Sequence, residues 1–138
     1  MKLIAIDDQS TRAGAEDLGS CQNDTKILAL ANDVDPRGVS LDGVTRIDLH
    51  FPKFTDGRAY SQAFLLRRRL GFTGEIRATG DVLIDQLVQM ERTGFDVAVL
   101  RADQNLDSAQ AQFDRFRSFY QGDAVTVQPH FVREGAAA

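Results

Sequence analysis

Short apolar runs alternate with stretches of helical periodicity between residues 44 and 128. The first run, Val44 to Phe51, alternates apolar and polar positions imperfectly, as a partly buried strand does. Over residues 57–70, apolar positions recur at spacings of four, three and four, which predicts a helix that ends at Gly71. Those positions are Ala59, Ala63, Leu66 and Leu70.

The same order of strand and helix recurs twice more. Residues 75–78 predict a second strand, and the helix that follows is expected to end at Gly94. Residues 95–100 are the most apolar run, which predicts a central strand buried on both faces. A third helix is expected to end before Gly122, and a last strand to cover residues 124–128. The apolar face of that third helix comprises Ala109, Phe113, Phe116 and Tyr120.

Strands that alternate with helices predict an α/β fold, in which repeated strand-helix units build a mainly parallel sheet flanked by helices. Either an open three-layer sheet or part of a (β/α) barrel fits this order. Upstream, two apolar runs flank the polar residues 7–25, which indicates a hairpin with a long loop or a loosely ordered extension. We expect one domain over residues 1–132, with a variable part (1–43) and a core (44–128), and a flexible tail at 133–138.

Composition narrows the class of protein and the compartment. A chain of 138 residues can bury roughly two-thirds of its unfolded surface in one core. The single Cys21 cannot form an internal disulfide, which fits a reducing compartment. The apolar run within residues 1–8 is too short for a signal peptide or a membrane span. We therefore expect a cytoplasmic protein without membrane contact. The net charge of -4 argues against a nucleic-acid partner.

Basic residues are concentrated in one part of the chain. Residues 53–77 hold six Lys and Arg side chains against two acids, which leaves the remainder strongly acidic. This basic segment can attract a small anion or an acidic partner surface. Within it, we interpret the triplet Arg67, Arg68 and Arg69 as the solvated face of a helix.

The candidate site lies where ligands usually bind in parallel sheets, at the carboxyl ends of the strands near helix N-termini. Each of three predicted strand ends supplies an arginine and an acid. We predict that Arg58, Arg77 and Arg101 hold a small oxyanion such as sulfite, sulfate, phosphate or a carboxylate. Asp56 or Asp81 would then move a proton. The ligand-binding candidates are Lys53, Asp56, Gly57, Arg58, Ser61, Arg77, Gly80, Asp81 and Arg101.

An alternative interpretation of the same residues is structural. The three arginines can pair with Asp56, Asp81 and Asp103 and tie the loops together without any ligand. His50 and His130 can act as bases or ligands only where folding brings a suitable partner to them. The sequence holds no Walker loop, Gly-x-Gly-x-x-Gly run, Cys-x-x-Cys pair or Ser/His/Asp order, so no cofactor and no metal site is predicted.

Two strings of residues resemble a bacterial family of unknown function whose members are usually labelled probable oxidoreductases of sulfite reduction. They are Phe-Pro-Lys-Phe-Thr-Asp-Gly-Arg-Ala-Tyr-Ser at 51–61 and Gly-Glu-Ile-Arg-Ala-Thr-Gly-Asp-Val-Leu at 74–83, followed by Asp85-Gln86 and Gly94-Phe95-Asp96. The resemblance implies a role beside assimilatory sulfite reductase, the enzyme that reduces sulfite to sulfide for cysteine synthesis. It does not imply a mechanism, because the sequence lacks a redox cofactor motif.

Three hypotheses of function follow. The first is a non-catalytic accessory protein of sulfur assimilation that binds or supports sulfite reductase. The second is an enzyme that acts on a small oxyanion or acid at the predicted strand ends. The third is a structural interaction module that forms homo-oligomers through an exposed sheet edge or helix surface.

Overall fold

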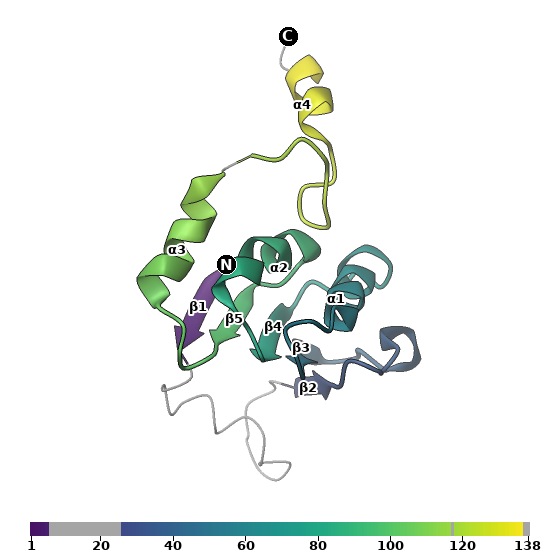
Figure 1. Cartoon of the computed structure of the whole chain (residues 1–138). Helices are drawn as coiled ribbons and strands as arrows, with labels where there is room; N and C mark the ends of the chain where they lie inside the picture. The colour runs from purple at the N-terminus through teal and green to yellow at the C-terminus, as the bar shows by residue number, and fades with distance from the viewer. Residues whose placement is uncertain (6–25, 117, 137–138) are drawn as a thin grey trace.

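A computed structural model describes residues 1–5, 26–116 and 118–136. Its centre is a sheet of five parallel strands in the order β1-β5-β4-β3-β2 (Figure 1). The α/β fold with a parallel sheet flanked by helices is therefore confirmed, and because β1 and β2 form two edges, the sheet is open. The strands are β1 (Lys2–Ala5), β2 (Lys26–Leu30), β3 (Val44–Phe51), β4 (Glu75–Gly80) and β5 (Val97–Leu100).

Helices connect successive strands much as the periodicity predicts. The helix after β3 is confirmed as α1 (Arg58–Arg68), although it ends before Gly71 and leaves Leu70 of the predicted stripe exposed. The helix after β4 begins as a 3-10 turn, η3 (Ile84–Gln86), and continues as α2 (Leu87–Thr93). Gly94 ends α2 in the left-handed conformation expected of a helix C-terminus. The remaining elements are η2 (Pro36–Gly38), α3 (Leu106–Arg115) and α4 (His130–Ala136). None of these helices is long and apolar enough to cross a membrane.

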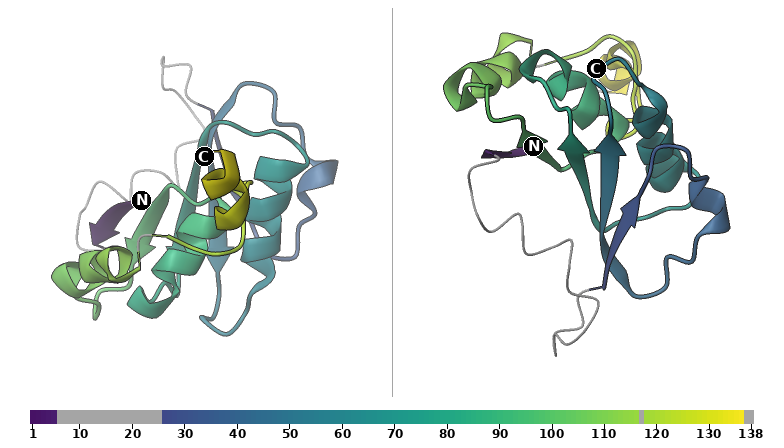
Figure 2. Two further views of the ribbon diagram at one scale, coloured as in Figure 1. Left: turned by 90° about the horizontal axis from the view of Figure 1, so that it is seen from above. Right: turned by 60° about the horizontal axis from the view of Figure 1, so that its bottom comes forward.

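The helices α1, α2 and α3 lie on one face of the sheet (Figures 1 and 2). This follows from the strand order, because β2 to β5 succeed one another in one direction and each right-handed crossover then passes over the same face. Alternate residues of the strands point into the core beneath those helices. The core includes Ile47, Leu49, Phe51, Ile76, Ala78, Ala98 and Leu100 from the strands and Ala63, Leu66, Leu87, Met90 and Ala109 from the helices.

The two N-terminal strands do not form a hairpin. β1 pairs with β5 and β2 pairs with β3, so they occupy opposite edges of the sheet, and both pairings are parallel. The hairpin interpretation is therefore wrong, because a hairpin requires antiparallel neighbours. Residues 7–25, and Cys21 with them, lie outside the described residues.

The chain after α3 differs most from the sequence prediction. The third helix ends at Arg115, so Phe116 and Tyr120 lie beyond it, and residues 124–128 form no strand. The reason is that β1 already pairs with the free side of β5, where a strand following α3 would dock. Instead, the Asp123 carboxylate accepts hydrogen bonds from the backbone amides of Val125 and Thr126, and the chain turns. Helix α4 then covers residues that the sequence assigned to the tail from 133 onward.

Arg67 is a structural residue and not part of a solvated face. Its side chain is only 15% exposed and pairs with Asp96. The guanidinium also donates hydrogen bonds to the backbone carbonyl oxygens of Gly94 (2.9 Å), Phe72 (2.8 Å) and Gly74 (2.7 Å). Arg67 thus joins the C-terminal part of α1 to the loops that lead into β4 and β5, whereas Arg68 and Arg69 are exposed as predicted.

Candidate functional site

Asp81 joins the three loops that follow β3, β4 and β5. It stands directly after β4, and its Oδ2 accepts a hydrogen bond from the backbone amide of Phe54 at 2.8 Å. Its Oδ1 accepts one from the Arg101 guanidinium at 2.7 Å, and Arg101 also pairs with Asp103 at 2.5 Å. Gln86 adds a hydrogen bond of 2.7 Å to the Phe54 carbonyl. The loops are therefore tied to one another by side chains that the sequence singled out.

Asp56 occupies the N-terminus of α1. Its carboxylate pairs with the Arg58 guanidinium at 2.9 Å and accepts a hydrogen bond from the Arg58 backbone amide at 3.2 Å. Asn32, in the turn after β2, donates a further hydrogen bond of 2.6 Å to the same carboxylate. A carboxylate of the protein thus lies beside the helix end that favours an anion, although the N-cap residue itself is Gly57.

Arg77 lies apart from the other two candidate arginines. It is in the middle of β4, on the face of the sheet opposite the helices, because its neighbours Ile76 and Ala78 are the residues that enter the core. There it pairs with Glu75 at 2.8 Å. The structure therefore brings Asp81 and Arg101 together, keeps Arg58 with Asp56, and gives each of the three arginines its own carboxylate.

The remaining candidates have simpler settings. Lys53 and Ser61 are exposed, and Gly57 is the residue preceding the first turn of α1. Gly80 has a φ of 92°, and a side chain there would meet the carbonyl oxygen of Phe51. Glycine at this position allows the ends of β3 and β4 to approach closely.

The carboxylates of this region are held in their ionised form. Hydrogen bonds from the Arg58 side chain and backbone lower the pKa of Asp56 to about 2. The amide of Phe54 and the guanidinium of Arg101 lower the pKa of Asp81, and Arg101 also lowers the pKa of Asp103. A lowered pKa weakens a carboxylate as a proton acceptor near neutral pH, and this applies to both Asp56 and Asp81.

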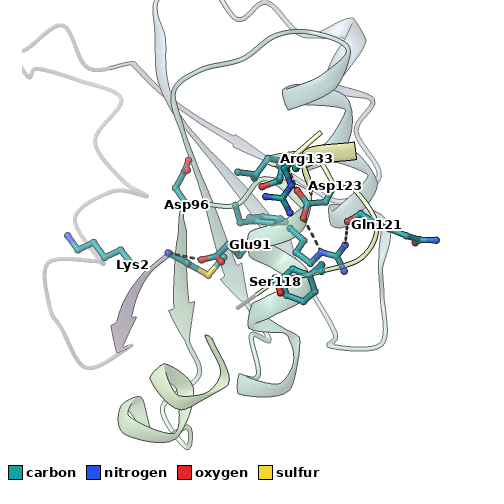
Figure 3. Close-up of a pocket in the computed structure, with 13 residues that line it drawn as sticks. Lys2, Glu91, Asp96, Ser118, Gln121, Asp123 and Arg133 are labelled. Atoms are coloured by element: carbon teal, nitrogen blue, oxygen red, sulfur yellow. Dashed lines mark hydrogen bonds and ion pairs between the residues drawn. The ribbon is translucent and has the colours of Figure 1, made fainter. Parts of the chain in front are cut away.

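A pocket of about 490 Å³ lies elsewhere, between the end of α2 and residues 118–126 (Figure 3). Its wall includes Glu91, Arg92, Phe119, Asp123 and Arg133, and none of the sequence-predicted site residues lines it. Much of its charge is internally paired, because Arg92 contacts Asp123 at 3.0 Å and Glu91 contacts the N-terminal amine at 2.8 Å. The pocket exists because the chain after α3 folds back against α2.

Residues 116–132, which we call the C-terminal segment, expose apolar side chains to solvent. Six large apolar side chains of this segment are each at least 43% exposed. Tyr120 and Phe131 lie against each other with ring centroids 5.6 Å apart. The sequence prediction missed this surface, because it assigned Phe116 and Tyr120 to a helix face and residues 124–128 to a strand. The exposed side chains are Phe116, Tyr120, Val125, Val127, Phe131 and Val132.

The C-terminal segment contacts the body of the protein through Arg92 on α2. The Arg92 guanidinium pairs with Asp123 at 3.0 Å, donates to the Gln121 carbonyl at 3.2 Å and lies 4.1 Å from the centroid of the Phe119 ring. The backbone amide of Ala124 donates to the Arg92 carbonyl at 3.0 Å. The exposed apolar side chains are therefore presented from a defined anchor.

Comparison with known proteins gives a family and no function. No curated protein and no solved structure matches the chain. Within the described residues, no group of three His, Cys, Asp or Glu side chains is placed to hold a metal ion. Residues 27–131 match the model of a family described as a bacterial protein of unknown function (DUF934), and because this match spans more than half of the chain, the protein belongs to that family.

Proposed function

We propose that this protein is a non-catalytic accessory of assimilatory sulfite reduction that binds sulfite reductase through its C-terminal segment. Two features support the proposal: a resemblance of sequence and an exposed apolar surface. The resemblance of residues 51–61 and 74–83 to proteins labelled as acting in sulfite reduction suggests the pathway. The exposed C-terminal segment suggests that the protein acts by contact with another macromolecule.

The observation that carries the proposal is the exposure of six large apolar side chains within residues 116–132. Contiguous apolar surface is uncommon on monomeric proteins and marks sites of interaction. Aromatic side chains contribute most to such contacts, and here the exposed rings of Tyr120 and Phe131 lie against each other in a tilted arrangement. The anchor at Arg92 limits the conformational freedom that would be lost when a partner binds.

The alternative of an enzyme for a small oxyanion has weaker support. Each candidate arginine already contacts a carboxylate (Asp56, Glu75, or Asp81 and Asp103), which offsets much of the positive charge that would attract an anion. The lowered pKa values of Asp56 and Asp81 also make poor general bases of them. The non-catalytic function is therefore the one we favour, and the proposal keeps the cytoplasmic location expected from the sequence.

The experiment that tests the proposal is capture with purified components. Tagged protein is mixed with purified assimilatory sulfite reductase of the same bacterium, and the bound fraction is measured. We expect the native chain to retain the enzyme, and a variant carrying Tyr120→Ser and Phe131→Ser to lose at least about tenfold in affinity, because two central aromatic contacts are removed.

The matched control is Phe64→Ser, which removes an exposed aromatic side chain of α1 outside the C-terminal segment. This variant should bind as the native chain does. Deletion of the gene should also slow growth on sulfate or sulfite and leave growth on cysteine unchanged. Absence of binding by the native chain, together with normal growth of the deletion strain on all three sources, would rule the function out.

A further inference from the structure

The face of the sheet opposite the helices carries an ordered set of charged and apolar residues. Among the described residues, no helix packs on this face (Figure 2). The residues of β2, β3 and β4 that alternate with the core positions point out of this face, and they include His50 and Thr79 near the ends of β3 and β4. We call the six that precede His50 and Thr79 along the strands the face array: Ile27, Ala29, Arg46, Asp48, Glu75 and Arg77.

The register of the strands arranges the face array in two rows. Ile27 lies beside Arg46 and Arg46 beside Glu75, which makes the first row. The second row is Ala29, Asp48 and Arg77, in the same order across the strands. Charges thus alternate both along each strand and between strands, and β2 adds an apolar residue to each row.

This pattern is complementary to itself. A two-fold axis that runs across the strands, between the two rows, would place each row of one copy over the other row of a second copy. Arg46 would then face Asp48, Glu75 would face Arg77, and Ile27 would face Ala29. Every facing pair is opposite in charge or apolar in both copies, as an isologous interface requires.

The charged side chains are prepared for such a contact. Arg46 binds Asp48 through two hydrogen bonds of 2.9 and 3.0 Å, and Arg77 binds one oxygen of Glu75 through two of 3.1 and 2.8 Å. These pairs fix the side chains, which reduces the entropy lost on association. The four side chains are only 16–37% exposed, so folding has already removed most of their surface from water and association would add little desolvation free energy.

Hydrogen-bonding capacity remains within the face array. Among the described residues, none donates a hydrogen bond to the Oε2 atom of Glu75. Likewise, no acceptor among the described residues binds the NH1 group of Arg46 or of Arg77. An arginine and a carboxylate of a second copy can complete these bonds. On β5, in contrast, Val97 and Val99 are only 3% and 6% exposed, so the face array is confined to β2, β3 and β4.

We propose that two copies of this chain associate face to face through the face array, with their sheets stacked and related by the two-fold axis described above. Stacked sheets keep their strand directions within about 30° of each other, which is compatible with strands that run in opposite directions. A contact of three short strands is small, so the dimer should be weak and reversible. The proposal does not depend on the proposed function, since the C-terminal segment is not part of the face array.

The decisive test uses a fully reversed array, R46D/D48R/E75R/R77E. This variant keeps the alternation of charge and should self-associate as the native chain does. When native and reversed chains are mixed, arginine would face arginine and carboxylate would face carboxylate. We expect mixed dimers at least tenfold weaker than either homodimer, measured by sedimentation velocity and by native mass spectrometry of chains of distinguishable mass.

A single substitution provides a second test. Ala29→Arg places a cation opposite Ile27 of the other copy and should weaken self-association at least tenfold. Gln110→Arg, an exposed position on α3, is the matched control and should leave it unchanged. A thermal melt confirms that each variant is folded. A mass of 15.2 kDa for the native chain at every concentration, or mixed dimers as abundant as homodimers, would overturn the proposal and assign this face to another occupant.

Discussion

Arg67 and Asp96 form the ion pair that joins α1 to the chain leading into β5. The Asp96 carboxylate also accepts a hydrogen bond of 3.0 Å from the backbone amide of Ile76, at the start of β4. Around this pair, the Arg67 guanidinium binds three backbone carbonyls that lie outside regular structure. A single side chain therefore binds polar groups of two separate loops, the one before β4 and the one before β5.

Replacement of Arg67 by lysine should destabilise the protein by about 2–4 kcal/mol, because an ammonium group cannot reach all of these acceptors and buried carbonyls lose their donors. Denaturant unfolding followed by circular dichroism measures the change. Arg68→Lys, one residue along and exposed, is the control and should lie within about 0.5 kcal/mol of the native chain. Equal stability of the two variants would contradict the structural role of Arg67.

Gly80 should be less tolerant of substitution than Gly38. A Cβ at Gly80 would lie 2.3 Å from the carbonyl oxygen of Phe51, and the residue has a positive φ, so Gly80→Ala should cost about 2–4 kcal/mol. Gly38 has open space around its Cα, so Gly38→Ala should be close to neutral. The comparison of the two free energies of unfolding isolates the close approach of β3 and β4, and similar values would argue against it.

The titration of Asp56 should depend on Arg58. The pKa of Asp56 is about 2 in the folded protein and about 3.9 in an unfolded chain. Because the folded value is the lower one, the stability contributed by this carboxylate is fully present above pH 3.9 and is lost as the pH falls towards 2. Arg58→Ala should raise the pKa of Asp56 towards 3.9, measured by carboxyl ¹³C NMR. Arg69→Ala should leave it unchanged, and an unaltered pKa in both variants would separate Asp56 from Arg58.

Removal of the anchor should loosen the C-terminal segment without unfolding the sheet. In Arg92→Ala, the contacts with Asp123, Gln121 and Phe119 are lost together. Hydrogen exchange of the Ala124 amide should accelerate at least about tenfold, which corresponds to about 1.4 kcal/mol, while the amides of β4 keep their protection. Arg115→Ala, on the exposed side of α3, serves as the control. Unchanged exchange at Ala124 would show that the anchor lies elsewhere.

The elements that sequence analysis predicted well are those specified by local pattern. The stripe of Ala59, Ala63 and Leu66 is buried on α1, and the apolar run before Arg101 is β5, buried along its whole length. The periodicity of apolar residues and the length of the run identify such elements, so they can be predicted without knowledge of tertiary contacts. The same holds for the loop linkage, since the interpretation that Arg58 and Arg101 pair with nearby acids agrees with the contacts of both side chains.

What local pattern could not supply was the pairing of distant segments. A strand over residues 124–128 was a sound prediction by composition, but β1 takes the place beside β5 that such a strand needs. Arg77 was placed at a strand end, whereas β4 continues to Gly80 and leaves Arg77 on the face away from the helices. Each difference depends on a contact between residues that are remote in sequence.

The pairing of β1 with β5 also constrains how the protein folds. Lys2 and its partner Val97 are 95 residues apart in the sequence, whereas Arg46 on β3 and its partner Glu75 on β4 are 29 apart. Closing the longer separation is the slow, non-local step that long-range strand pairing imposes. We therefore expect β1 to dock late, against a sheet in which the strands closer in sequence have already paired.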